Sequence, residues 1–292
     1  MLVFRDKLLH AASLLEIRSR RNIASLLAGD YRSTFRGSGM QFKEFRTYEP
    51  GDDIRHMSWT VTARTGKPTV KVYEEERELN IVALVDASGS TAVGSTQRKI
   101  DMYAEITALL GLAAVRAGDP FSVVLFSDKV LAHLPAHRST EHVRQAMSLV
   151  QNQPLAGEAS DLRPALSYLR RALKPRSLIL VVSDFLMPSF GLELRALATR
   201  HEVVLLHGFD VAEAGEGLSG VYRVWDPESG RFGLLDGGSR GARARLAEYQ
   251  AKLVQELQDL GRNCGADYLP LRVEDDYLKS LVHFFHQRGA RR

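Results

Sequence analysis

A carboxylate and two hydroxyls stand at alternate positions in the segment Asp86-Ala87-Ser88-Gly89-Ser90, directly after an apolar run of strand length. Side chains at alternate positions of a loop can converge on one point. Such an all-oxygen set suits a hard divalent cation such as Mg²⁺, which takes oxygen ligands and keeps several of its waters. The simpler alternative is that the two serines cap the next helix while Asp86 forms an Asx turn.

Two further segments carry oxygen ligands toward the same place. An apolar run at 178–182 is followed by Ser183 and Asp184, and Ser160 and Asp161 precede a helical pattern. In a doubly wound parallel sheet, ligands bind where the carboxyl ends of neighbouring strands meet. We therefore predict a metal site at which Asp86, Ser88, Ser90 and Asp184 converge with a side chain of the middle loop, either Ser160 or Asp161.

The elements that must position these loops alternate along the chain from residue 79 onward. Apolar runs predict strands at 79–85, 121–126, 130–134, 178–182, 203–207 and 268–271. Amphipathic patterns predict helices at 99–116, 141–151, 162–173, 192–199, 242–260 and 277–287. This alternation predicts an α/β fold with a doubly wound, mostly parallel sheet and helices on both of its faces.

The chain divides at residue 79 in this interpretation. Residues 1–78 form an N-terminal segment that is helical over 1–27 and rich in short strands and turns afterwards, and we expect it to pack on the following domain. Residues 79–292 form the α/β domain. A β-hairpin is inserted into it at about 210–238, because two alternating runs flank a turn-forming stretch that contains proline and glycine.

The composition excludes several classes of protein. The chain has 292 residues, 45% hydrophobic and 25% charged, which is typical of an ordinary globular protein. Its one cysteine, Cys264, cannot form an internal disulfide, and no secretory signal opens the chain, so we expect a cytoplasmic location. No apolar stretch approaches the roughly 18 residues of a membrane span. A net charge of +4 does not indicate binding to nucleic acid.

The spacing of the oxygen ligands resembles the metal-ion-dependent adhesion site of von Willebrand factor type A domains. That motif reads Asp-x-Ser-x-Ser, then a threonine, then an aspartate after the fourth core strand. The resemblance implies a three-layer sandwich in which Asp86, Ser88 and Ser90 are the first-loop ligands. Asp184 then stands for the last carboxylate and Ser160 for the threonine, whose hydroxyl it keeps without the methyl group that restricts the rotamer.

A longer signature lies upstream of this site. It comprises Gly37-Ser38-Gly39, the run from Glu44 to Trp59, the run from Ala63 to Lys67, and Glu74-Glu75-Glu76. The pattern resembles the bacterial family called domain of unknown function 58, from about residue 30 to the end of the chain. The resemblance implies a non-enzymatic protein that binds a MoxR-type AAA+ ATPase and assists the maturation or assembly of other proteins.

The signature also has a structural interpretation that requires no partner. Asp52 and Asp53 are placed where Arg55 or Arg64 could pair with them, and such a network would fix the loop. In the other interpretation, Trp59 and Arg46 are exposed and form the centre of a protein interface.

The sequence therefore predicts a metal-dependent protein-protein interaction module and not an enzyme. We expect Mg²⁺, or else Mn²⁺ or Ca²⁺, with an open coordination position for a carboxylate of the partner protein. The enzyme alternative is an α/β-type serine hydrolase centred on Ser239 in a G-x-S-x-G pattern, with Asp267 and His283 following in the order of those enzymes. Ser239 also suits a helix N-cap, and its preceding strand belongs to the hairpin, which favours the binding module.

Overall fold

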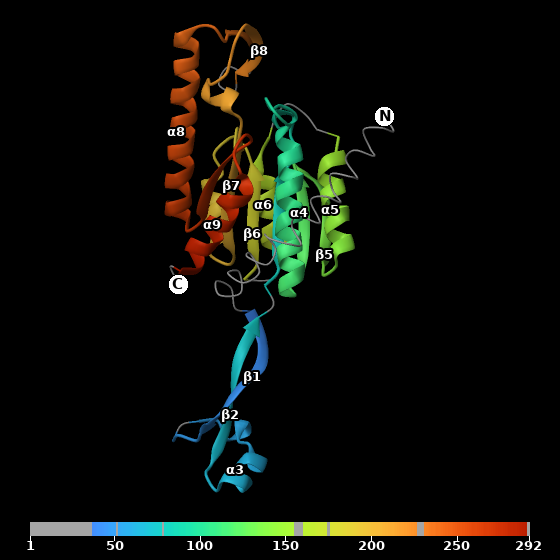
Figure 1. The fold of residues 1–292 in the computed structure, drawn as a ribbon, viewed down its shortest axis with the longest axis vertical. Coiled ribbons are helices and arrows are strands. Elements are labelled where there is room, and N and C mark those ends of the chain that lie inside the picture. Colours follow the sequence, from blue (N-terminus) through green and yellow to red (C-terminus); the bar gives the residue numbers. More distant parts are fainter. Residues whose placement is uncertain are drawn as a thin grey trace.

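A six-stranded sheet forms the body of the protein (Figure 1). The structure, a computed structural model, describes residues 37–50, 52–77, 79–154, 160–173, 176–226 and 231–290. The strand order is β10-β7-β6-β3-β4-β5, and all neighbouring pairs are parallel except β4 with β5. The strands are β3 (Ile81–Asp86), β4 (Phe121–Phe126), β5 (Val130–His137), β6 (Leu178–Ser183), β7 (Glu202–Phe209) and β10 (Asp267–Arg272). The 3-10 turn η3 (Gly89–Ala92) follows β3. This arrangement confirms the predicted α/β fold class.

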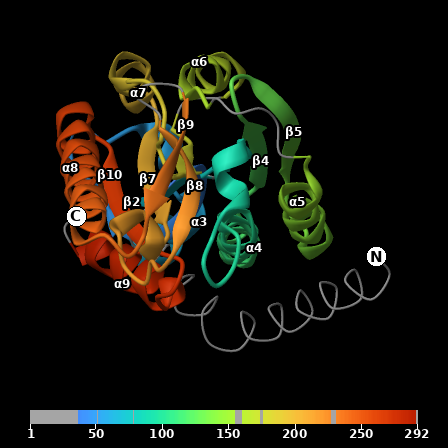
Figure 2. The same ribbon diagram turned by 90° about the horizontal axis from the view of Figure 1, so that it is seen from above.

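Helices cover both faces of the sheet and complete three layers (Figure 2). One face carries α4 (Lys99–Ala117), α5 (Thr140–Asn152) and α9 (Tyr277–Ala290), and the other carries α6 (Leu162–Ala172), α7 (Gly191–Ala198) and α8 (Arg240–Cys264). Alternate residues of β3 enter the two cores: Ala83 and Val85 lie under the first three helices, and Val82 and Leu84 under the other three. Burial on both faces explains the unbroken apolar runs of the sequence. None of the helices in the described ranges has the length and apolar character to cross a membrane.

Both edge strands of this sheet contain a proline. Pro135 lies in β5 and Pro270 lies in β10, and each of these strands has a neighbour on one side only. Proline has no N–H to donate, so within sheets it is confined to edge strands, bulges and first residues. The register of β5 against β4 shifts between Leu134 and His137, which is where Pro135 lies.

The insertion after β7 contains the predicted hairpin. It begins with the 3-10 turn η4 (Val211–Ala214) and continues into the antiparallel strands β8 (Val221–Asp226) and β9 (Arg231–Asp236). Gly215 ends η4 with a φ of +74°, and a Cβ there would lie 2.4 Å from the carbonyl oxygen of Arg243, so this close approach requires glycine. The hairpin stands at the top of Figure 1, beside the start of α8.

The described part of the N-terminal segment is an arm that extends away from the three layers (Figure 1). The arm pairs β1 (Gly37–Thr47) with β2 (Thr69–Arg77) and carries η2 (Ile54–His56) and α3 (Trp59–Thr65) between them. In Figure 1 the described residues of the arm lie away from the six-stranded sheet, whereas we expected the segment 1–78 to pack on the α/β domain. The helix predicted at 1–27 lies outside the described residues.

One of the two acids in the loop of the arm has a different partner from the one predicted. Asp52 pairs with Arg46 at 2.8 Å, where Arg55 or Arg64 was expected, and Glu49 lies 3.3 Å from the same guanidinium group. The hydrogen bond from the Glu49 backbone N–H, followed by the one from Arg46, lowers the pKa of Asp52.

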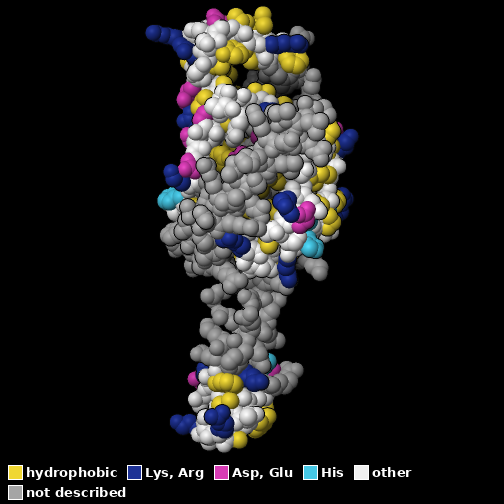
Figure 3. Space-filling model, turned by 45° about the vertical axis from the view of Figure 1, so that its right-hand side comes forward, with side chains coloured by type: hydrophobic (Ala, Val, Ile, Leu, Met, Phe, Trp, Pro, Cys, Tyr) yellow, Lys and Arg dark blue, Asp and Glu magenta, His cyan; other side chains and the backbone are white. Residues whose placement is uncertain are grey.

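Large apolar side chains are exposed on both the arm and the hairpin, at the two ends of the view in Figure 3. Trp59 of the arm is 67% exposed and Ile54 is 62% exposed. On the hairpin, Val221, Phe232 and Leu234 are exposed in the same way. Exposed apolar side chains that gather in this way are typical of surfaces that contact another protein.

Candidate metal centre

The five predicted metal ligands come together at the carboxyl edge of the sheet. Asp86 ends β3, Ser88 and Ser90 lie at the start of η3, Ser160 precedes α6, and Asp184 directly follows β6. The Oγ atoms of Ser88 and Ser90 lie 3.1 Å apart. The hydroxyl of Ser90 also contributes to lowering the pKa of the Asp184 carboxyl. The structure thus places oxygen atoms from three separate loops in one cluster, as the topology of parallel strands predicts.

Asp86 is the centre of this cluster. Its Oδ2 accepts hydrogen bonds from Ser160 Oγ at 3.2 Å and from Ser183 Oγ at 2.6 Å. Its Oδ1 accepts a hydrogen bond from the backbone N–H of Ser88 at 2.9 Å. Asp86 is completely buried, and this burial, followed by the negative charge of Asp184, raises its pKa to about 6. A carboxylate that is costly to ionise gains stability from a cation placed beside it.

Ser160, and not Asp161, turns toward Asp86. Asp161 caps α6 by accepting a hydrogen bond from the backbone N–H of Arg163 at 2.9 Å, and it pairs with the guanidinium group of Arg163 at 2.7 Å. Of the two alternatives for the middle loop, the structure therefore brings only Ser160 within hydrogen-bonding distance of the cluster.

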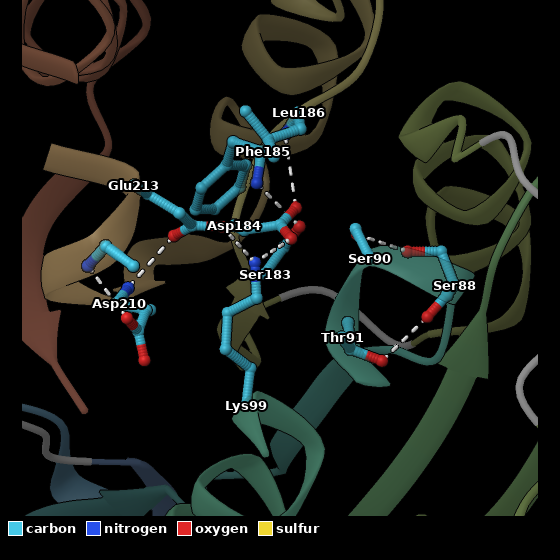
Figure 4. A network of polar contacts seen from close by, with 12 residues as sticks. Ser88, Ser90, Thr91, Lys99, Ser183, Asp184, Phe185, Leu186, Asp210 and Glu213 are labelled. Carbon is cyan, nitrogen blue, oxygen red and sulfur yellow. Dashed lines mark hydrogen bonds and ion pairs between the residues drawn. The ribbon is translucent and has the colours of Figure 1, made fainter. Parts of the chain in front are cut away.

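Lys99, which the sequence interpretation missed, lies in the same cluster. It begins α4, is 1% exposed, and directs its ammonium group at two carboxylates (Figure 4). Lys99 Nζ lies 2.6 Å from Asp184 Oδ2 and 2.6 Å from Glu213 Oε1. Burial raises the pKa of Asp184, but the positive charge of Lys99 and the hydrogen bonds to the carboxylate together outweigh burial and lower the pKa overall. The Lys99 pKa is itself raised, because the two carboxylates outweigh the effect of burial.

Glu213 belongs to the turn η4 and connects the cluster to the insertion. Its Oε2 accepts a hydrogen bond from the backbone N–H of Asp210 at 2.9 Å, while Asp210 Oδ1 accepts one from Ala212 N–H at 2.8 Å. This reciprocal capping box holds η4. Asp210 Oδ2 also accepts a hydrogen bond from the backbone N–H of Ser95 at 2.5 Å. The D-x-x-E spacing was visible in the sequence and could have located this turn.

The donor set of the cluster fits a hard divalent cation. Two carboxylates and three hydroxyls are the oxygen ligands that Mg²⁺, Mn²⁺ and Ca²⁺ prefer. Within the described ranges, no three histidine, cysteine, aspartate or glutamate side chains are close enough together to hold a metal ion. A cation here would therefore depend on the serine hydroxyls as well as on Asp86 and Asp184, and Lys99 already contacts one oxygen of Asp184.

Comparison with protein families places the chain in one of them. A family model described as "Protein of unknown function DUF58" matches residues 44–256, which include most of the arm, the cluster and most of the sheet. The chain belongs to the DUF58 family. A DUF58 relative, "Uncharacterized protein Rv1480" of Mycobacterium tuberculosis, is 31% identical over 293 residues, covering 97% of this chain and 91% of the relative.

Solved structures resemble this DUF58 chain only distantly. The BatB protein of Bacteroides thetaiotaomicron aligns with a TM-score of 0.46 and 12% identity, over 73% of this chain and 100% of BatB. The VWA domain of SpRpn10 aligns with a TM-score of 0.40 and 10% identity, over 71% of this chain and 95% of that domain. Likenesses at this level assign no ligand and no activity to the cluster of the DUF58 chain.

The residues of the hydrolase alternative are engaged in separate structural contacts. Ser239 is the N-cap of α8 and accepts a hydrogen bond from Ala242 N–H at 3.4 Å. Asp267 pairs with Arg288 at 2.6 Å, and His283 contacts Gln287 at 2.8 Å. A nucleophile, by contrast, needs its base within hydrogen-bonding reach and the base oriented by a third group.

Replacing Ser239 with alanine should lower the free energy of unfolding by at most about 1 kcal/mol, because only a helix cap is lost. Ser139→Ala is the matched control, since Ser139 caps α5 through His142 N–H at 3.1 Å. Urea denaturation measures both changes, and a fluorophosphonate probe should label neither variant nor the wild type. Labelling of the wild type that Ser239→Ala abolishes would establish the hydrolase.

Proposed function

We propose that this DUF58 protein is a metal-dependent protein-binding module and has no enzymatic activity. The observation that carries the proposal is the convergence of oxygen-bearing side chains from three loops at the carboxyl edge of the sheet. Mg²⁺, Mn²⁺ or Ca²⁺ bound there would supply a positive charge that attracts a carboxylate of the partner protein.

The side chains of the cluster have distinct roles in this proposal. Asp86 supplies a carboxylate that its serine neighbours orient, and Ser88, Ser90 and Ser160 supply neutral hydroxyls. Because three of the five ligands are neutral hydroxyls and the ammonium group of Lys99 lies in the same cluster, a bound cation stays attractive to an incoming acid. The partner should therefore contribute an aspartate or a glutamate to the contact.

We infer the identity of the partner from the resemblance carried by the signature of the arm. That resemblance implies a MoxR-type AAA+ ATPase, with a role of the complex in the maturation or assembly of other proteins. The exposed Trp59 gives a second candidate interface on the same protein, because large exposed aromatic residues are frequent binding hot spots. The metal centre and the arm are separate interfaces, so they can be tested independently.

Measuring the dissociation constant of the complex with a purified MoxR-type ATPase tests the proposal. Removing Mg²⁺ with EDTA should weaken the complex by roughly 5- to 150-fold, the range of typical coupling between two ligands. The ATPase itself uses Mg²⁺, so the control is the double variant Ser88→Ala/Ser90→Ala. In the presence of Mg²⁺ this variant should bind as weakly as the wild type does in EDTA. If the double substitution leaves the affinity for the ATPase unchanged and Trp59→Ala abolishes binding, the arm is the interface and the metal-dependent function is refuted.

A further inference from the structure

Lys99 occupies a position that several physical rules oppose. Its side chain is 1% exposed, and an ammonium group taken out of water loses a large solvation free energy. It also begins α4, where the helix dipole disfavours a positive charge. Local violations of this kind are expected at functional sites, since a surface lysine or a buried apolar residue would serve the fold better. The role of Lys99 must therefore lie in the two carboxylates that it contacts.

The ammonium group is shared between two acids that come from different elements. Asp184 follows β6 and its side chain is 2% exposed, whereas Glu213 lies in η4 and its side chain is 26% exposed. Both oxygens lie 2.6 Å from Lys99 Nζ (Figure 4). The ammonium can thus lose its contact with Asp184 and keep a counter-ion in Glu213.

Both oxygens of the Asp184 carboxylate already accept a hydrogen bond, and one of the two donors is the ammonium group of Lys99. Asp184 Oδ1 already accepts a hydrogen bond from the backbone N–H of Leu186 at 3.2 Å, which fixes the orientation of the carboxylate. Asp184 Oδ2 accepts a hydrogen bond from the ammonium group of Lys99 at 2.6 Å. A cation that takes Asp184 as a ligand must therefore displace the ammonium group of Lys99 from Oδ2 or share the carboxylate with it, and in both cases the positive charge of Lys99 opposes metal binding.

We propose that Lys99 is a positioning residue that competes with the divalent cation for Asp184 and thereby sets the metal affinity of the site. Metal binding at Asp184 moves the ammonium group toward Glu213, which stabilises the metal-bound arrangement. This inference rests on the proposed metal-dependent function of the same centre. It makes Lys99 and Glu213 act with opposite signs: Lys99 weakens metal binding, and Glu213 strengthens it.

Calorimetric titration of the full chain with Mn²⁺ tests this competition. Lys99→Met should bind Mn²⁺ at least about tenfold more tightly than the wild type, because a positive charge within about 4 Å of a ligand is removed. Glu213→Gln should bind Mn²⁺ about three- to tenfold more weakly. Of the two carboxylates that contact the ammonium group, only Asp184 then remains ionised, so Lys99 holds Asp184 more strongly against the metal. Lys252→Met removes an exposed lysine of α8 and should leave the affinity within about twofold.

A double variant separates competition from a general effect of charge. If Glu213 acts through Lys99, then adding Glu213→Gln to Lys99→Met should change the affinity by less than about twofold. A simple effect of charge would instead weaken Mn²⁺ binding equally in both backgrounds, and that result would overturn the inference.

The titrations distinguish failure of this inference from failure of the proposed function. If the wild type binds Mn²⁺ and Lys99→Met binds it equally or more weakly, the role of Lys99 is overturned. The proposed metal-dependent function is not affected by that result. Binding by Lys99→Met alone supports the competition but refutes metal-dependent function in the wild type. Absence of binding in both proteins overturns both proposals. If circular dichroism shows that Lys99→Met is unfolded, the single Glu213→Gln variant decides, and unchanged or tighter binding overturns the inference.

Discussion

Replacing Asp86 with asparagine should lower the affinity for Mn²⁺ or Mg²⁺ by at least about 100-fold, which corresponds to about 2.7 kcal/mol. Asparagine keeps the shape and one acceptor oxygen but removes the charge on which a hard cation depends. Asp86 stands where Ser160, Ser183 and the Ser88 backbone converge, so no other side chain of the cluster takes its place. Calorimetric titration of the variant and the wild type measures the difference.

In the absence of metal, Asp86→Asn should have at least the same free energy of unfolding as the wild type. Burial raises the pKa of Asp86 from its usual value to about 6. The contribution of the protonated carboxyl to the free energy of unfolding is therefore lost as the pH rises through about 6. At pH 7.5 the ionised carboxylate is therefore a cost, and a neutral amide removes it. Asp101→Asn, in the first turn of α4 and paired with Arg98, is the control that should leave metal affinity unchanged. Equal metal affinity in Asp86→Asn and wild type would mean that the ligand set is wrong.

Replacing Asp184 with alanine should destabilise the fold itself, by roughly 3–5 kcal/mol. The substitution leaves the ammonium group of Lys99 buried with Glu213 as its remaining carboxylate contact. Breaking a buried ion pair by removing one partner is costly because the other charge stays out of water. Urea denaturation in EDTA measures the loss without any contribution from bound metal.

Two further variants show whether the buried charge is the cause. Asp184→Ala/Lys99→Met should be less destabilised than Asp184→Ala alone, because the second substitution removes the buried ammonium group that has lost one of its two carboxylates. Asp259→Ala breaks an exposed pair with Arg262 and should change the free energy of unfolding by no more than about 0.5 kcal/mol. A loss below about 1 kcal/mol in Asp184→Ala would mean that Glu213 alone compensates Lys99.

The sequence was sufficient to predict the parts of the site that depend on strand order. The apolar runs that became β3 and β6 are buried on every residue, and a parallel sheet requires their carboxyl ends to meet. Asp86 and Asp184 were therefore predictable as neighbours. Strand ends were less accurate: β5 extends to His137 and β7 begins at Glu202, because half-exposed strand ends lack a continuous apolar run.

The ion pairs of the protein were not predictable in the same way. Lys99 contacts Asp184 and Glu213, which are 85 and 114 residues away along the chain. Lysine is almost never fully buried unless it is paired, so a single sequence favours placing Lys99 in solvent. Arg46 was likewise missed as the partner of Asp52, since several arginines near that loop fit the pattern equally well.

The prolines at the two borders of the central sheet restrict how this protein can associate. Many proteins bind peptides, or one another, by letting an extended segment continue a sheet through main-chain hydrogen bonds. A segment joining at β5 would meet Pro135, and one joining at β10 would meet Pro270, and neither residue has an N–H to donate. Strand addition and the fibre growth that it permits are therefore disfavoured at both borders.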